Sequence, residues 1–251
     1  MAGDPLISVR DLVQKIGPQE ILRGFSLEIF QGETLVLLGK SGGGKSVFLR
    51  HLIGLMKPIS GQILFEGRDI AAKKERELVP IRRKIGMLFQ DGALFDSMNV
   101  YDNVAFPLRE HGQKNEKIVR EKVHEALALV NMSANDKKMP VNLSGGMRKR
   151  VALARAIISP PQVILYDEPT AGLDPIMSDS INRLIRRLQE QLSVTSIVVT
   201  HDMISCYKIA DRVALLNEGR RHFYGTLDEL RDTQDEIVRD FVDGRSQDEE
   251  D

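Results

Sequence analysis

One glycine-rich octapeptide constrains the fold of this chain more than any other feature. Residues 39–46 read GKSGGGKS, which matches the pattern GxxxxGKS. The apolar run from Thr34 to Leu38 precedes it, and a helical pattern from Val47 to Leu55 follows it. Glycines let backbone N–H groups turn inward around a phosphate chain, and the N-terminus of the following helix adds a favourable dipole. The order of strand, loop and helix therefore predicts a phosphate-binding loop in an α/β fold.

The side chains of this loop add specific chemistry. Lys45 supplies a mobile positive charge for terminal phosphates, and the Ser46 hydroxyl is a candidate ligand for Mg²⁺. The predicted phosphate-binding residues are Gly39, Lys40, Ser41, Gly42, Gly43, Gly44, Lys45, Ser46 and Val47.

Short β-rich runs alternate with helical patterns along the chain, which predicts parallel strands joined by crossover helices. Continuous apolar runs are expected where both faces of a sheet are covered, and they occur at Thr34–Leu38, Ile85–Phe89, Val163–Tyr166, Ser196–Thr200 and Val213–Leu216. Three earlier segments alternate in polarity and predict a second, antiparallel sheet: Ile7–Val9, Phe25–Phe30 and Gln62–Glu66.

Helical periodicity replaces the strand pattern between Asn99 and Ile158. We predict a single domain over residues 6–245. It consists of a phosphate-binding core with its β-subdomain (6–98 and 159–225), an inserted helical subdomain (99–158) and a C-terminal helix (226–245). Thr226 and Glu229 form a capping box for that helix, which we expect to run towards Phe241. The acidic residues 246–251 predict a disordered tail.

Composition limits the functions that remain. Of the 251 residues, 42% are hydrophobic, which is enough apolar material for a core, and the formal net charge of −1 disfavours nucleic acid as a partner. The single cysteine, Cys206, cannot form an internal disulfide, and residues 1–10 lack the apolar core of a signal peptide. No run approaches the roughly 20 apolar residues that span a bilayer. We expect a cytosolic chain that acts at membranes only through a partner.

Two carboxylates end the apolar run that begins at Val163. Asp167 and Glu168 would lie at the carboxyl edge of a parallel sheet, where open α/β sheets bind ligands. Asp167 fits a partner of Mg²⁺, and Glu168 fits a group that orients and polarises an attacking water. Residues 169–174 follow at once and read PTAGLD.

A possible anion-binding helix start lies upstream, at residues 143–147, which read LSGGM. The helix that follows is predicted over Arg148 to Ile158, with its apolar positions on one face. Ser144, Gly145 and Gly146 would place a hydroxyl and backbone N–H donors at its N-terminus.

Together these motifs make residues 6 to about 225 resemble the nucleotide-binding subunit of an ATP-binding-cassette (ABC) transporter. The resemblance implies an α/β P-loop NTPase (RecA-like) core with an N-terminal antiparallel β-subdomain and an inserted α-helical subdomain. It also implies ATP and Mg²⁺ as cofactors and ATPase activity. By the same resemblance, Gln90 contacts Mg²⁺ and the transport partner, Asp174 belongs to the D-loop, and His201 lies near the γ-phosphate.

The sequence departs from this family at the adenine-stacking position. Relatives place an aromatic residue there, and the equivalent position falls near Gln14 in a segment without one. We expect aliphatic contacts such as Val13 or Ile16 to hold the base instead.

Residues 87–110, MLFQDGALFDSMNVYDNVAFPLRE, form the segment most suited to contact a partner, with ordinary packing in the helical insertion as the alternative. This stretch and the tail from Val238 to Gly244 are similar to ATPases of the Mla phospholipid-transport system and of related transporters that use MCE-domain lipid-binding proteins. Within that subfamily the C-terminus reaches the neighbouring ATPase protomer, although Phe241 could equally pack within its own terminal helix.

The resemblance implies a motor that moves phospholipid between inner and outer membranes. It would be bound peripherally, through an integral-membrane permease, to the cytoplasmic face of a bacterial inner membrane. Its sites would be completed by two copies, with Lys45 and Ser46 of one chain facing Ser144 and Gly146 of the other. Glu168, His201 and Lys45 would be catalytic, and Ser46, Gln90 and Asp167 would hold the metal. Three alternatives remain: transport of another cargo such as an amino acid or a metal complex, a cytosolic role on ribosomes or DNA, and a non-catalytic scaffold.

Overall fold

The computed structural model describes residues 3–245, which divide into two compact units. The first unit contains residues 3–74 and 199–245, and the second contains residues 75–198. The boundary falls inside strand β8 (Thr195–Thr200). The predicted disordered tail, 246–251, lies outside the described residues.

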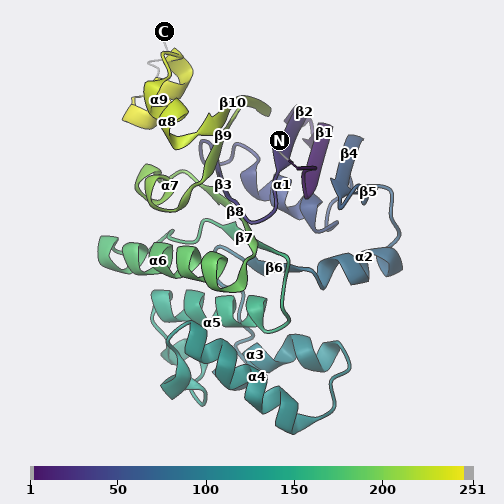
Figure 1. Cartoon of the computed structure of the whole chain (residues 1–251), viewed down its shortest axis with the longest axis vertical. Helices are drawn as coiled ribbons and strands as arrows, with labels where there is room; N and C mark the ends of the chain where they lie inside the picture. Colours follow the sequence, from purple (N-terminus) through teal and green to yellow (C-terminus); the bar gives the residue numbers. More distant parts are fainter. Residues whose placement is uncertain (1–2, 246–251) are drawn as a thin grey trace. The chain divides into compact units, whose positions relative to one another are not determined.

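The first unit contains an antiparallel sheet with the strand order β2-β1-β4-β5 (Figure 1). Its strands are β1 (Ile7–Ile16), β2 (Gln19–Ile29), β4 (Ser60–Phe65) and β5 (Arg68–Asp69). Side chains that alternate towards one face are buried, among them Ile7, Val9 and Ile63. The antiparallel sheet predicted from alternating polarity is therefore confirmed.

The same unit holds the strands that flank the phosphate-binding loop. Strand β9 (Arg212–Asn217) pairs in parallel with β3 (Thr34–Leu38) and antiparallel with β10 (Arg220–Thr226). Every residue of β3 is buried, as the continuous apolar run predicts. The helices of this unit are α1 (Lys45–Leu52), α7 (Met203–Ile209), α8 (Leu227–Asp232) and α9 (Glu236–Asp243).

The C-terminal segment corrects the prediction of one helix from Thr226 towards Phe241. Thr226 and Glu229 do form the predicted capping box, but α8 ends at Asp232 and α9 begins at Glu236. The Asp235 carboxylate caps α9 by accepting from the Val238 N–H at 3.1 Å, and it also contacts His222 Nε2 at 2.9 Å. These two contacts favour a helix start where the prediction continued the first helix.

The second unit contains two complete parallel strands, the first part of β8 and most of the helices. Strand β6 (Ile85–Leu88) pairs with β7 (Val163–Asp167), and all of β7 is buried. The helices are α2 (Glu75–Arg82), α3 (Val100–Glu110), α4 (Glu116–Leu129), α5 (Gly145–Ile157) and α6 (Pro175–Leu192), with short 3₁₀ turns at Ser133–Asn135 and Pro140–Asn142.

Helices α3, α4 and α5 lie side by side and fill the predicted helical stretch 99–158 (Figure 1). The predicted apolar face of α4 is buried, as shown by Val119, Val123 and Leu127, which have no exposed area. Helical periodicity therefore identified the packed face correctly.

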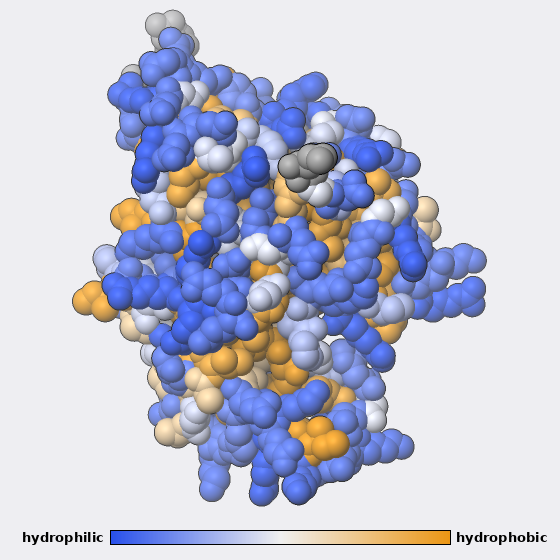
Figure 2. Space-filling model, in the orientation of Figure 1, coloured by the Kyte–Doolittle hydropathy of each residue, from blue (hydrophilic) through white to orange (hydrophobic). Residues whose placement is uncertain are grey.

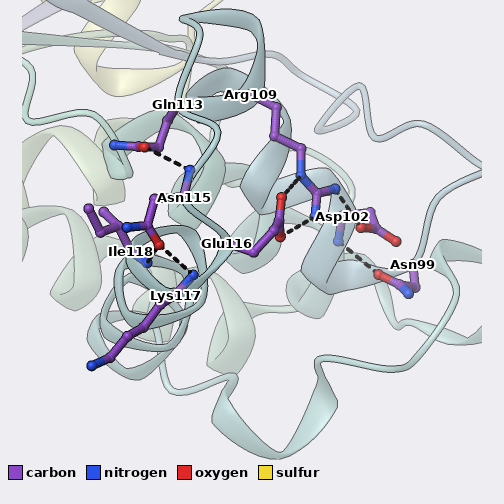
Figure 3. A network of polar contacts seen from close by, with 8 residues as sticks. All are labelled: Asn99, Asp102, Arg109, Gln113, Asn115, Glu116, Lys117 and Ile118. Atoms are coloured by element: carbon purple, nitrogen blue, oxygen red, sulfur yellow. Dashed lines mark hydrogen bonds and ion pairs between the residues drawn. The ribbon is translucent and has the colours of Figure 1, made fainter.

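A network of polar contacts joins the end of α3 to the start of α4 (Figure 3). The Arg109 guanidinium donates to Asp102 at 2.9 Å and to Glu116 at 3.1 Å, so one side chain links the two helices. Asn99 and Asn115 cap α3 and α4 by accepting from backbone N–H groups of the first turn. Because Arg109 and its partners are exposed, we expect these ion pairs to add little stability.

Asn103 makes a stronger polar connection inside the helical part. Its side chain is fully buried, and its amide nitrogen donates to the carbonyls of Phe95, Met98 and Asn99 at 2.9–3.0 Å. Its amide oxygen accepts from the Phe95 N–H at 2.8 Å. Asn103 therefore fixes the loop that carries Phe95.

No helix within residues 3–245 combines the length and the apolar character needed to cross a membrane.

We predict that Asn103→Ala lowers the free energy of unfolding by about 3 kcal/mol, because the Phe95 N–H loses the Asn103 side-chain oxygen as acceptor and the Met98 carbonyl loses the Asn103 amide as donor. Urea denaturation followed by circular dichroism measures this loss. Arg109→Gln is the control, since it removes exposed ion pairs and should cost less than about 1 kcal/mol. Equal losses in the two variants would contradict the role given to Asn103.

Candidate functional site

The glycine-rich loop connects β3 to α1 in the first unit, in the order that the sequence predicts. Gly42 and Gly44 have positive φ angles of 75° and 104°, which side-chain-bearing residues rarely adopt. A Cβ at Gly44 would lie 2.8 Å from Ile21 Cγ2, and one at Gly39 would lie 2.7 Å from the Leu216 carbonyl oxygen. Only glycine fits these two positions, so the loop can bring its backbone close to a ligand.

Lys45 lies over this loop. Its side chain is 6% exposed, and Nζ donates to the carbonyls of Gly39 at 2.7 Å and Lys40 at 3.1 Å. The first turn of α1 carries no acidic residue, and Gly44 provides no side chain to cap it. A lysine charge and the positive end of a helix dipole therefore favour an anion at this loop.

His201 follows β8 directly, as predicted, and lies in the same unit as the loop. Together with Lys40 and Ser41 it lines a cavity of about 390 Å³, whose other walls include Ile237 and Phe241 of α9. Asp202 caps α7 by accepting from the Ile204 N–H at 2.9 Å, which fixes the backbone beside the histidine.

The position predicted for adenine stacking is turned inward. Gln14 is only 9% exposed, and its Oε1 lies 3.2 Å from His51 Nε2 on α1. Burial lowers the pKa of His51, partly offset by its contact with the Val47 carbonyl, so the neutral imidazole is favoured. Ile16, by contrast, is 49% exposed. Of the two aliphatic candidates for a base contact, Ile16 has the more accessible side chain, since Val13 is half-buried.

The two predicted carboxylates occur together in the second unit. Asp167 ends β7 and is 7% exposed, and Glu168 follows it with a positive φ of 45°. A left-handed conformation costs a residue other than glycine about 1–3 kcal/mol. The Glu168 carbonyl accepts from the Ala171 N–H at 3.1 Å, so a tight turn holds this strained residue.

Lys149 of α5 is the functional candidate that sequence reasoning missed. It is 5% exposed, and Nζ donates to the Glu168 carbonyl oxygen at 3.1 Å. Burial lowers the pKa of Lys149, while the carboxylates of Asp91, Glu168 and Asp167 act in the opposite direction. No local pattern marks this residue, because a lysine in an amphipathic helix is normally solvated.

The remaining predicted residues also belong to the second unit. Ser144 is the N-cap of α5 and accepts from the Met147 N–H at 3.3 Å, which confirms the predicted helix start. Asp174 is the N-cap of α6 and accepts from the Met177 N–H at 2.9 Å. Gly146 packs against Met177, whose Cε a Cβ at this position would overlap. Gln90 is exposed beyond the end of β6.

The predicted metal ligands fit Mg²⁺ by their chemistry. Ser46, Gln90 and Asp167 offer hydroxyl, amide and carboxylate oxygens, the hard ligands that Mg²⁺ prefers. Within the described residues no three His, Cys, Asp or Glu side chains form a metal-binding group. Mg²⁺ usually keeps several waters and binds through one or two carboxylates and substrate phosphates.

A phosphate-binding loop after a buried parallel strand, together with carboxylates at the end of another, defines the chain as a P-loop nucleotide-binding protein. Comparison with known proteins narrows the class. The family model described as "ABC transporter" matches residues 22–171.

Two relatives and one solved structure illustrate the similarity. The chain is 45% identical over 239 residues to the "probable ribonucleotide transport ATP-binding protein mkl" of Mycobacterium leprae, covering 95% of this chain and 69% of the relative. It is 42% identical over 241 residues to the "intermembrane phospholipid transport system ATP-binding protein MlaF" of Haemophilus influenzae, covering 96% and 91%. A dimeric ATP-binding cassette in a post-hydrolysis state, bound to ADP and Pi, has a TM-score of 0.80 at 30% identity, covering 88% of this chain and 98% of its own.

The chain therefore belongs to the ABC transporter family. Its activity is that of an ATPase that uses ATP with Mg²⁺.

Proposed function

We propose that this chain is the ATP-hydrolysing motor of a membrane transporter that moves phospholipid between the inner and outer membranes. One observation carries the proposal. The relative named for intermembrane phospholipid transport matches nearly end to end, over 96% of this chain and 91% of its own length.

The residue roles follow from the chemistry of phosphoryl transfer. Lys45 and the backbone of the glycine-rich loop bind the terminal phosphates, and His201 contacts the γ-phosphate. Ser46, Gln90 and Asp167 would hold Mg²⁺, which when bound would neutralise charge on the phosphate oxygens.

Glu168 has the role of accepting a hydrogen bond from the attacking water and polarising it. The water oxygen then bonds to the γ-phosphorus as the bond to the β–γ bridging oxygen breaks. The proton passes to the Glu168 carboxylate, and ADP leaves with phosphate. Hydrolysis needs this carboxylate in one orientation relative to the phosphorus, because the attacking and leaving oxygens must lie nearly in line.

The working unit in this proposal is a dimer of two copies. Ser144 and Gly146 of one copy face the phosphates bound to Lys45 and Ser46 of the other, with Asp174 near the junction. Ser144 is suited to this role because its oxygen accepts the capping bond from Met147, which leaves the hydroxyl hydrogen to donate to a phosphate. The dimeric state of the ADP-bound cassette supports the same arrangement.

A groove in the second unit supports an integral-membrane permease as partner. Its cavity of about 500 Å³ lies between β6, α3 and α5. Hydrophilic side chains cover most of the face seen in Figure 2, with apolar side chains in separate patches. Phe89 and Phe95, which line this groove, are 36% and 40% exposed, an arrangement suited to an apolar helix of a partner.

The structure divides the predicted partner segment 87–110 into two parts. Leu88 and Val100 have no exposed area and belong to the core, so they are unavailable to a partner. Phe95 packs on Phe106 with the ring centroids 4.7 Å apart and lies under the Arg155 guanidinium. We propose that the aromatic part of this segment binds the permease and holds the chain at the cytoplasmic face of the inner membrane, with an MCE-domain lipid-binding protein in the same complex.

The mycobacterial relative at 45% identity favours a second candidate cargo, since its name refers to ribonucleotide transport. The two cargoes differ in chemistry, because a phospholipid carries acyl chains and a ribonucleotide does not. Purification of the tagged chain from detergent-solubilised membranes, followed by mass spectrometry of bound small molecules, separates them. Enrichment of phospholipid with a permease and an MCE-domain protein supports the proposal, and enrichment of ribonucleotides other than ATP and ADP would overturn the phospholipid cargo.

We predict that Glu168→Gln lowers kcat for ATP by about 100-fold or more while ATP binding and dimer formation persist, because only the water-polarising carboxylate is lost. Lys45→Ala should instead weaken ATP binding by about tenfold or more. Steady-state ATPase assays, equilibrium binding and light scattering measure these effects. Rapid turnover by Glu168→Gln would contradict the role of Glu168.

We predict that Phe95→Glu reduces the permease recovered with the tagged chain by about tenfold or more, since it replaces the exposed aromatic ring in the groove with a charge. Ile204→Glu is the matched control, because Ile204 is an apolar residue, 67% exposed, that does not line this groove. Thermal unfolding checks that both variants fold. Undiminished recovery of the permease with a folded Phe95→Glu protein would rule out this groove.

A further inference from the structure

Helix α5 donates hydrogen bonds from three cationic side chains to backbone carbonyls of other segments. Arg150 donates to the Val130 carbonyl at 2.7 Å, and Arg155 donates to Gly92 and Ala93 at 2.8 and 2.7 Å. Lys149 donates to Glu168 at 3.1 Å. The helix that begins at Ser144 is therefore tied both to the segment after Gln90 and to the backbone of the predicted catalytic carboxylate.

The Lys149 contact falls on a residue whose backbone needs support. Glu168 has a positive φ of 45°, and its carbonyl oxygen already accepts from the Ala171 N–H at 3.1 Å. With Lys149 as a second donor, this oxygen is held from two sides. Because ψ of a residue sets the direction of its Cα–Cβ bond relative to the peptide plane that contains its carbonyl, fixing the Glu168 carbonyl restricts where the Glu168 side chain begins.

The surroundings of Lys149 explain why a cation is retained there. A buried ammonium is costly unless charges and hydrogen bonds compensate it. Lys149 is 5% exposed, and burial disfavours its charge, but the carboxylates of Asp91, Glu168 and Asp167 favour it and the ammonium donates to the Glu168 carbonyl.

We propose that Lys149 is a positioning residue for ATP hydrolysis. It holds the backbone of Glu168 so that the carboxylate keeps the orientation in which it polarises the attacking water. This inference rests on the role given to Glu168 in the proposed function. Lys149 lies on helix α5, which Ser144 caps. In the proposed dimer, Ser144 contacts the ATP bound to the partner copy, and Glu168 acts on the ATP bound to its own copy. Lys149 therefore connects these two parts of one chain.

The proposal predicts a change in kcat without a matching change in KM. Lys149→Met keeps much of the side-chain length and removes the donor, so the Glu168 backbone loses the restraint that Lys149 provides. Displacing a reacting group by a fraction of an ångström to an ångström costs about 10- to 100-fold in rate. We expect kcat of the full chain with Mg-ATP to fall by about that factor, while KM for ATP stays within about twofold.

Two further variants separate positioning from general packing. Lys149→Arg keeps a cationic donor and should restore most of kcat. Arg187→Met removes a comparable bond, from Arg187 to the Leu129 carbonyl at 2.8 Å, in the same unit. It should lower the melting temperature yet leave kcat per folded molecule unchanged.

A double variant tests whether Lys149 acts through Glu168. If it does, Lys149→Met adds little to the loss already caused by Glu168→Gln, because the carboxylate that Lys149 positions is gone. Independent action would multiply the two losses and overturn the proposal. The proposal would also be overturned by wild-type kcat in a folded Lys149→Met protein. It would be overturned as well if Arg187→Met lowered kcat per folded molecule as much as Lys149→Met does.

The outcomes also distinguish this inference from the proposed function. Rapid hydrolysis by Glu168→Gln alone removes the proposed role of Glu168. If Glu168→Gln hydrolyses ATP slowly and Lys149→Met keeps full activity, the role of Glu168 stands and only the positioning role proposed for Lys149 is refuted.

Discussion

The complete burial of two short parallel strands is the constraint on which the rest of the structure depends. Every residue of β3 and of β7 is buried, so polar chemistry can begin only where each strand ends. The glycine-rich loop follows β3, and Glu168 follows β7. Strand burial thus fixes the places in the chain where the phosphate-binding loop and the carboxylate proposed to polarise water can stand.

The residues that follow β3 and β7 adopt unusual backbone conformations in different ways. After β3 the chain uses glycine, because a Cβ at Gly39 or Gly44 would collide with neighbouring atoms. After β7 the proposed mechanism requires a carboxylate; Glu168 stands there in a left-handed conformation, and its carbonyl accepts from Ala171 and Lys149. Strain at this position is consistent with the general tendency of strained backbone to occur at functional sites.

Much of the fold could be predicted because its signals are local. Thr34–Leu38 was predicted at its observed bounds, and the other four buried strands were predicted within a residue at either end, since continuous apolar runs have few other solutions. Strand β10 was missed because Arg220, Arg221 and His222 are exposed, so no apolar run marks the start of the strand; Arg220 and Arg221 pair with β9, and His222 lies at an irregularity in the register. The break before α9 was missed although Asp235 is a local cap signal, because the apolar spacing continues past it; the contact between Asp235 and His222, thirteen residues apart, adds to that cap and has no local signal.

The residues of the candidate site also divide into those that have a local sequence signal and those that do not. Ser144 could be placed at a helix start because a serine before two glycines is a local cap signal. Lys149 could not be found, since its importance comes from a carbonyl nineteen residues away. The inward turn of Gln14 likewise depends on His51 of another element.

The central claim is that two copies of the chain complete each ATP site, and mixing two inactive variants tests it most directly. Lys45→Ala disables the phosphate-binding loop, and Ser144→Arg disables the facing helix start. A mixed dimer contains one site with both defects and one site with none. The account predicts that ATPase activity, low in each variant alone, rises on mixing and is greatest near equal amounts. Activity that stays at the level of the separate variants at every ratio, with mixed dimers shown to form, would contradict it.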